Sequence, residues 1–216
     1  AFIDSSVTIG PPIAAGSLTL VPLLAETATH PPYLTLAEGL STGKLELREI
    51  GEGVVPEIQV LNQLDVAVLI FEGGDVIVAK QNRVVNTTIL VAAHTTTTIP
   101  VTFTEQGRWH HVAPEFGHSG YTAPPSLRAN NAASVGDSLH RHGTRRSDQV
   151  AAWSAVAAAP RRAGVHSPTG ALRDVFADRQ AELDTLTSDL AVAPNQVGAI
   201  ALVDGLVARS PEDPAT

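Results

Sequence analysis

Short segments rich in β-branched residues follow one another through the first 122 residues, and no long helical pattern lies between them. Valine, isoleucine and threonine favour half-buried strands because their branched side chains pack well on a pleated surface. The clearest strands are expected at residues 45–50, 54–61, 66–71 and 76–79. A series of about seven or eight short strands predicts an antiparallel, sandwich-like body.

The pattern changes at Pro124-Pro125-Ser126, after which three helices are predicted. Serine is a good N-cap and proline disrupts a helix interior, so these residues set the expected limits. The first helix is expected from Ser126 to about Leu139, the second from an N-cap at Ser147 to Pro160, and the third from Ser167 or Pro168 to about Leu190. The side chains expected to be buried on them are Leu127, Val135, Leu139, Val150, Trp153, Val156, Leu172, Val175, Phe176, Leu183, Leu186 and Leu190.

The chain closes with a predicted β-hairpin, because Asp204-Gly205 is a favoured two-residue turn between apolar segments. The predicted fold class is therefore α+β: an antiparallel β-sandwich-like body, then a helical section, then a C-terminal hairpin. We expect one domain over residues 1–216, with a β-rich part at 1–122, a helical part at 123–190 and the returning hairpin at 191–208.

Composition and charge exclude several functional classes. Without cysteine, disulfides and thiolate chemistry are excluded, and a reducing, cytoplasmic location is expected. No apolar run approaches the roughly 18 residues of a membrane-spanning helix. Residues 1–79 carry two basic and ten acidic side chains, whereas residues 80–179 carry eleven basic and six acidic ones. This uneven distribution argues against nucleic-acid binding and favours a local cationic pocket for an anionic small molecule. The sequence indicates no particular oligomeric state.

The strongest candidate for a binding site is the cluster Lys80-Gln81-Asn82-Arg83 between two apolar segments. Arginine offers a planar fork for phosphate, lysine a point charge, and the two amides can bind a ribose or the edge of a base. Asn86, three residues later, is added to the predicted ligand-binding set. The alternative is a hairpin turn whose charges are solvated.

Two acidic residues near this cluster, Glu72 and Glu105, are the candidate catalytic residues. Each could act as a general base, or it could orient Lys80, Arg83 or Arg108 through an ion pair. Arg108 is therefore included among the ligand-binding candidates.

A further group of charged residues lies near the predicted helix starts: Arg128, Arg145, Arg146 and Asp148. Free backbone N–H groups at a helix N-terminus favour anions, so an arginine beside one makes a phosphate site. Arg128 and Asp148 complete the predicted ligand-binding set. The alternative is a solvated basic face.

The eight histidines do not have the spacing of a metal site. No metal site and no cofactor site are predicted.

Five sequence blocks, in this order, carry a resemblance to a known family. They are Ala79–Thr87, Ile99–Val101 with Glu105–Trp109, Pro125–Arg128, Arg146–Gln149 and Ser167–Arg173. Together they resemble the first class of ADP-ribosylglycohydrolase- and rhodanese/phosphatase-associated protein domains. Phe103 stands where that family often has a cysteine, so a thiol mechanism is not expected.

The resemblance implies a link to NAD or ADP-ribose metabolism by association rather than by mechanism. We therefore expect binding of an ADP-ribose-like or other nucleotide phosphate ligand, and processing of that ligand stays open. The alternative is a non-catalytic interaction module whose polar clusters are structural. The two hypotheses differ in whether the charged groups surround an open pocket or form buried pairs.

Overall fold

The computed structural model describes residues 7–26, 32–51, 56–77, 82–104, 117–167 and 172–207. Its contacts divide the chain into two compact units. One unit combines Ala1–Pro31 with Arg179–Thr216, and the other is Pro32–Asp178. The fold class is α+β, as predicted. That residues 1–216 form one domain stays a prediction.

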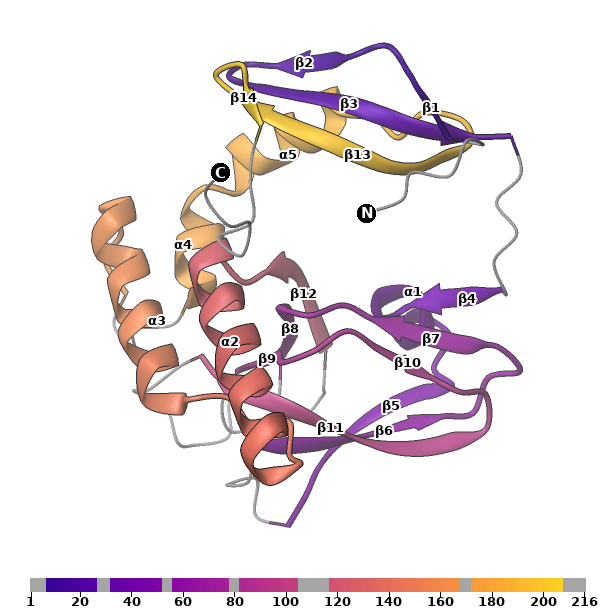
Figure 1. Ribbon diagram of the computed structural model, residues 1–216, viewed down its shortest axis with the longest axis vertical. Coiled ribbons are helices and arrows are strands. Elements are labelled where there is room, and N and C mark those ends of the chain that lie inside the picture. Colours follow the sequence, from indigo (N-terminus) through magenta and orange to yellow (C-terminus); the bar gives the residue numbers. More distant parts are fainter. Residues whose placement is uncertain are drawn as a thin grey trace. The chain divides into compact units, whose positions relative to one another are not determined.

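The first unit joins both ends of the chain in one antiparallel sheet. β13 pairs with β3 from Gln196 opposite Leu24 to Val203 opposite Leu18 (Figure 1). The unit consists of β1 (Val7–Ile9), β2 (Ile13–Ala15), β3 (Leu18–Ala25), α5 (Gln180–Asp189), β13 (Gln196–Val203) and β14 (Leu206–Val207).

The C-terminal hairpin is confirmed as β13 and β14. Its turn residues have positive φ angles, 51° at Asp204 and 78° at Gly205. A two-residue turn of this type needs left-handed conformations, which aspartate tolerates and glycine adopts at little cost.

The described residues of the second unit form two sheets and four helices (Figure 1). The six-stranded sheet is antiparallel in the order β12-β8-β9-β11-β6-β5, and the three-stranded sheet has the order β10-β7-β4. Its elements are β4 (Tyr33–Thr35), α1 (Leu36–Ser41), β5 (Leu45–Glu49), β6 (Glu57–Asn62), β7 (Ala67–Ile70), β8 (Gly74–Ile77), β9 (Arg83–Val85), β10 (Ile89–Val91), β11 (Thr95–Phe103), β12 (Gly117–Thr122), α2 (Pro125–His142), α3 (Gln149–Ala163) and α4 (Leu172–Asp178).

The main core of this unit is formed by alternate side chains of its strands. Along β6, Ile58 and Val60 are fully buried while their neighbours are partly exposed. Ile99 of β11 lies opposite Ile58 and is also fully buried. One face of each strand is therefore apolar, as the period-two pattern predicts. Side chains of the three-stranded sheet, such as Val68 and Val91, belong to the same cluster.

A second, smaller core holds the helices on the sheet. Leu127 of α2, Val156 of α3 and Leu172 of α4 pack in one buried cluster with Val84 of β9. The expected burial of these three residues on the helices is thereby confirmed.

The limits predicted for the second helix are wrong at both ends. Its N-cap is Asp148 rather than Ser147, and the Asp148 carboxylate accepts from the N–H groups of Val150 and Ala151. Pro160 lies inside α3 and does not end it. The helix ends at Ala163 because Gly164 takes the left-handed conformation that allows a C-cap.

Two of the residues expected in the helix core are exposed. Leu139 is 42% exposed and Val150 is 70% exposed. Val150 is the second residue of α3, two positions after the capping Asp148, and it does not belong to the buried cluster.

The long third helix is two helices, because Arg179 lies between α4 and α5 with φ −104° and ψ 18°. Its expected start at Ser167 or Pro168 borders residues 168–171, which lie outside the described residues. Ser167 itself donates a hydrogen bond to Asp174 Oδ2 at 2.6 Å.

Candidate functional site

Arg83, the centre of the predicted phosphate cluster, is fully buried at the start of β9. Its Nη2 lies 3.1 Å from Glu49 Oε1, and its Nη1 donates to the carbonyl of Glu57 at 3.1 Å. The guanidinium carbon lies 4.8 Å from the centre of the Phe103 ring. Burial lowers the pKa of Arg83 from its ordinary value, and the charge of Glu49 opposes this shift. Arg83 therefore links three strands beneath the surface.

The two asparagines of the predicted ligand-binding set, Asn82 and Asn86, are also buried. Asn82 is 2% exposed, and its carbonyl accepts from the N–H of Thr104. Asn86 is 1% exposed, accepts from Thr102 Oγ1 at 2.5 Å and donates from Nδ2 to the carbonyl of Arg145 at 3.5 Å. Asn86 thus connects the sheet to the segment between α2 and α3. As ligand contacts, Asn82, Arg83 and Asn86 stay predictions.

Four predicted site residues, Lys80, Gln81, Glu105 and Arg108, lie outside the described residues. The convergence of Glu72, Lys80, Arg83, Glu105 and Arg108 is therefore untested and stays a prediction, as do the catalytic roles of Glu72 and Glu105.

Glu72 precedes a glycine turn against which Arg128 packs. The N–H of Glu72 donates to Thr88 Oγ1 at 3.1 Å. The next residue, Gly73, has φ 74°, and a Cβ placed there would lie 2.4 Å from Arg128 Cδ. Arg128 therefore packs directly over a glycine that no other residue can replace without displacement.

The Arg146–Gln149 block attaches the start of α3 to the sheet. Ser147 Oγ is hydrogen-bonded to Thr102 Oγ1, and the Gln149 side chain binds the backbone of Phe103. Asp148, a predicted ligand-binding residue, caps α3. These contacts fix the position of the preceding residues, Arg145 and Arg146.

Arg145 and Arg146 line a groove of about 490 Å³ between the α2–α3 connection and the sheet. We call it the Arg145–Arg146 groove. Its lining residues are Pro56, Glu57, Thr98, Pro100, Leu139, Gly143, Thr144, Arg145 and Arg146. Pockets for small molecules commonly measure about 300–1,000 Å³, so the groove has the volume of a ligand site.

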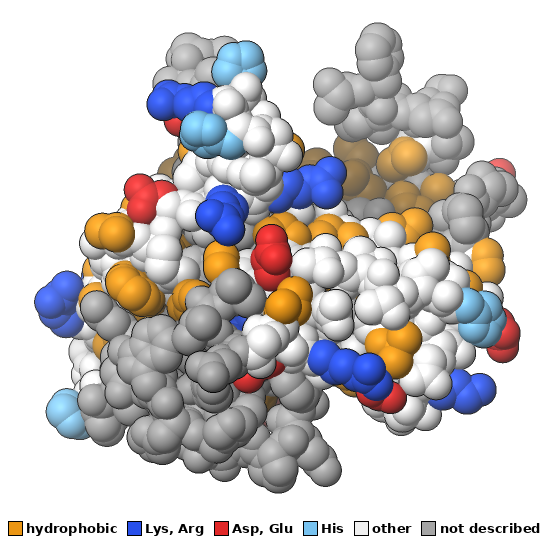
Figure 2. Space-filling model, turned by 90° about the horizontal axis from the view of Figure 1, so that it is seen from below, with side chains coloured by type: hydrophobic (Ala, Val, Ile, Leu, Met, Phe, Trp, Pro, Cys, Tyr) orange, Lys and Arg blue, Asp and Glu red, His pale blue; other side chains and the backbone are white. Residues whose placement is uncertain are grey.

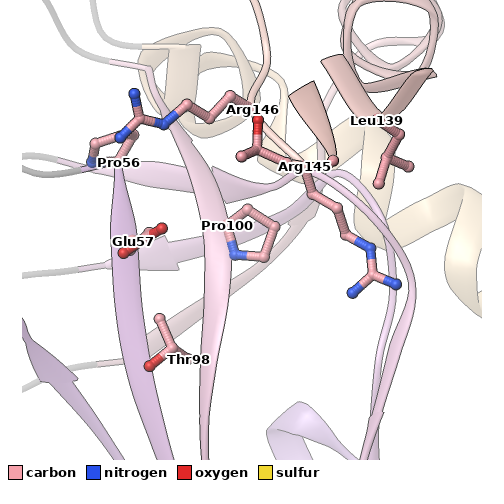
Figure 3. A pocket seen from close by; sticks show the side chains of 9 residues that line it. Pro56, Glu57, Thr98, Pro100, Leu139, Arg145 and Arg146 are labelled. Atoms are coloured by element: carbon pink, nitrogen blue, oxygen red, sulfur yellow. The ribbon is translucent and has the colours of Figure 1, made fainter. Parts of the chain in front are cut away.

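The side chains in this groove come from β6, β11, the end of α2 and the α2–α3 connection. Figure 3 shows Arg145 and Arg146 extending in different directions beside Pro100, with Glu57 and Thr98 on the strands. Pro100 of β11 pairs with Glu57 of β6, so the groove floor is formed by two neighbouring strands. The strand register therefore brings Glu57 to the arginines, although 88 and more residues separate them in the chain.

The groove carries two basic side chains and one carboxylate, that of Glu57. Among the described residues, the guanidinium groups of Arg145 and Arg146 form no ion pair. On the face shown in Figure 2, basic side chains lie close to acidic and hydrophobic ones. The two guanidinium groups and the hydroxyls of Thr98 and Thr144 form an environment suited to phosphate oxygens.

Six predicted site residues lie within the described part of the chain, and none of them lines this groove. They are Glu72, Asn82, Arg83, Asn86, Arg128 and Asp148. The sequence indicates Arg145 and Arg146 as cations near a helix start. It does not predict that Glu57, Thr98 and Thr144 belong to a site. A possible signal was the exposed alternation of threonines in 95–98, which marks the solvent face of a strand.

The described residues contain no group of three or more histidine, aspartate or glutamate side chains that could hold a metal ion. No helix among them combines the length and the apolar character needed to cross a membrane.

Comparison with known families gives a match over residues 6–210, to the family described as the ARG and Rhodanese-Phosphatase-superfamily-associated Protein domain. The chain belongs to this family. The match covers both compact units, so the sheet that joins the chain's two ends is part of the family's domain. No curated protein and no solved structure matches the chain.

Proposed function

We propose that this protein binds a phosphate-bearing small molecule, a nucleotide or an ADP-ribose-like compound, in the Arg145–Arg146 groove. The observation that carries the proposal is the pair of consecutive arginines, without ion-pair partners among the described residues, on the wall of a groove of about 490 Å³. Each guanidinium can donate two parallel hydrogen bonds to phosphate oxygens.

The groove also supports recognition of more than the phosphate. Glu57 contributes a carboxylate, and Thr98 and Thr144 contribute hydroxyl groups. A carboxylate repels a bare anion but accepts hydrogen bonds from hydroxyl or amino groups. A ligand that carries both a phosphate and such groups therefore matches the groove better than inorganic phosphate does.

The position of the two arginines is defined by the contacts behind them. The carbonyl of Arg145 accepts from the buried Asn86, and Ser147 is bonded to Thr102. A side chain on a fixed backbone loses less entropy when a ligand binds, and this favours affinity. In this proposal Asn86 acts through Arg145 and not by touching the ligand.

Family membership supports the choice of ligand only by association with ADP-ribosylglycohydrolase and rhodanese-phosphatase systems. On the five sequence blocks, we place the chain in the first class of the family. We also propose a cytoplasmic location, because a chain without cysteine has no disulfides that need an oxidising compartment.

The second candidate is a non-catalytic interaction module. It is favoured by one observation: Arg83, the centre of the predicted cluster, is fully buried against Glu49 and holds strands together. This is the arrangement expected when polar clusters are structural.

Calorimetric titration separates the two candidates. The intact 216-residue chain is titrated with ADP-ribose, AMP and inorganic phosphate at low and at high salt. We expect ADP-ribose and AMP to bind more tightly than inorganic phosphate, and more weakly as salt rises, because the contacts are ionic. If a folded sample binds none of them at millimolar concentration, the interaction module is the better account.

A further inference from the structure

A second groove lies against the first one. It measures about 600 Å³ and shares Thr144 and Arg146 with the Arg145–Arg146 groove. We call it the Ser138–Asp148 groove. Its lining residues are Ser134, Asp137, Ser138, Arg141, His142, Thr144, Arg146, Ser147 and Asp148. The shared arginine means that one ligand can reach both grooves.

The charges of the second groove nearly cancel. Asp137 and Asp148 are acidic, and Arg141 and Arg146 are basic. The Arg141 Nη2 atom lies 3.6 Å from Asp137 Oδ2, and both side chains are largely exposed. A second phosphate would gain little here, whereas a neutral group with several hydroxyls would not be repelled.

The hydrogen-bonding groups of this groove match a polyol. Asp148 uses Oδ1 to cap α3, and among the described residues its Oδ2 accepts no hydrogen bond. Asp137 likewise retains Oδ1 beside its contact with Arg141. The hydroxyls of Ser138 and Thr144 lie 2.7 Å apart, and because one donates to the other, one proton remains to donate to a ligand.

We propose that the Ser138–Asp148 groove binds the vicinal diol of a sugar whose phosphate is held by Arg146. The diol donates to carboxylate oxygens and accepts from the serine–threonine pair, which is how an acidic side chain binds the hydroxyls of a ribose in other folds. The ligand class is then a ribose phosphate or ribonucleotide, and not a bare phosphate or a deoxyribose compound. This inference rests on the proposed function.

Calorimetry with three probes tests it on the intact chain: pyrophosphate, ribose 5-phosphate and 2-deoxyribose 5-phosphate. Pyrophosphate reports on the arginines alone. We expect ribose 5-phosphate to bind about tenfold more tightly than the 2-deoxy compound, because a hydrogen bond to a charged group contributes at least that factor.

Two substitutions locate the effect. Asp137→Ala and Ser138→Ala should each reduce the preference for ribose over deoxyribose to below about threefold. Because Ser138→Ala removes no charge, it should also leave pyrophosphate binding within about twofold of the unsubstituted chain, whereas Asp137→Ala releases Arg141 and should not weaken it. Ser154→Ala is the matched control, since Ser154 is an exposed helical serine that bonds to the carbonyl of Val150 outside both grooves. Circular dichroism establishes that each variant is folded.

Each outcome decides the inference. Equal affinity for the ribose and deoxyribose compounds, with pyrophosphate still bound, overturns the diol site and leaves the proposed function standing. A ribose preference that survives both substitutions overturns the assignment to this groove. Failure of all three probes to bind overturns the proposed function and the diol site together.

Discussion

The side-chain amide of Gln149 binds both backbone groups of Phe103: Nε2 donates to the carbonyl and Oε1 accepts from the N–H, each at 2.9 Å. The side chain therefore pairs with both backbone groups of the last residue of β11. Since Gln149 is the first residue of α3, this contact attaches the helix start to the sheet. It holds the segment that carries Arg145 and Arg146.

Replacing Gln149 should destabilise the protein. Gln149→Ala removes two hydrogen bonds and leaves the Phe103 backbone groups without these partners, so the free energy of unfolding should fall by about 1–3 kcal/mol. Urea denaturation measures it. Gln63→Ala is the control, because Gln63 is exposed and contacts Glu46 at the surface, and it should change stability by less than about 0.5 kcal/mol. Equal effects of the two substitutions would contradict the proposed attachment.

Arg83 should act on stability and not directly on ligand affinity. Arg83→Met leaves the carboxylate of Glu49, which is only 12% exposed, without its cation, and we expect a loss of about 3–5 kcal/mol. The double variant Arg83→Met/Glu49→Gln should lose less than the sum of the single variants, because the two side chains interact directly. If the losses in unfolding free energy of the two single variants add up in the double variant, the ion pair is not the cause of the destabilisation.

Gly73 tests the packing of Arg128. Gly73→Ala forces a left-handed alanine and places its Cβ against the Arg128 stem, whereas Gly43→Ala has a similar φ, 69°, with open space around the new Cβ. Left-handed strain alone costs about 1–2 kcal/mol, so Gly43→Ala should lose that much and Gly73→Ala clearly more. Thermal denaturation compares them. Similar losses of stability in Gly73→Ala and Gly43→Ala would indicate that the Arg128 side chain moves aside freely.

The capping box of α1 predicts a dependence on pH. Hydrogen bonds from the Thr35 N–H and hydroxyl lower the pKa of Glu38 below its ordinary value of 4.5. The charged form is favoured in the folded state, so its stabilisation is present above 4.5 and is lost as the pH falls through the lowered pKa. Glu38→Gln should therefore be less stable than the unsubstituted chain at neutral pH. The difference should shrink in acid, and a denaturation series across pH that shows a constant difference contradicts this.

The sequence predicted those elements whose signals are local. The Asp204-Gly205 turn, the alternation in β6 and β11 and the apolar stripes around Leu127 and Val156 all depend on neighbouring residues. The start of α3 was predicted wrongly because Ser147 and Asp148 are both good N-caps. Only the contact of Ser147 with Thr102, which is distant in sequence, decides between them.

The environment of Arg83 could not be predicted in this way. Its partners Glu57 and Glu49 lie 26 and 34 residues earlier in the chain, and only the sheet register brings them together. A charged residue at a strand end resembles an exposed turn in sequence. The Arg145–Arg146 groove has the same origin, because its walls come from β6, β11, the end of α2 and the α2–α3 connection.

The most direct measurement is the affinity of ADP-ribose for Arg146→Ala, compared with Arg162→Ala, by calorimetry at low salt. Both are exposed arginines, but Arg162 lies in the last turn of α3 and lines neither groove. Loss of a charge-assisted contact should weaken binding to Arg146→Ala by about 1.5–3 kcal/mol, roughly tenfold or more, and leave Arg162→Ala within about twofold of the unsubstituted chain. Equal affinity of the two variants for ADP-ribose would contradict a phosphate site in the Arg145–Arg146 groove.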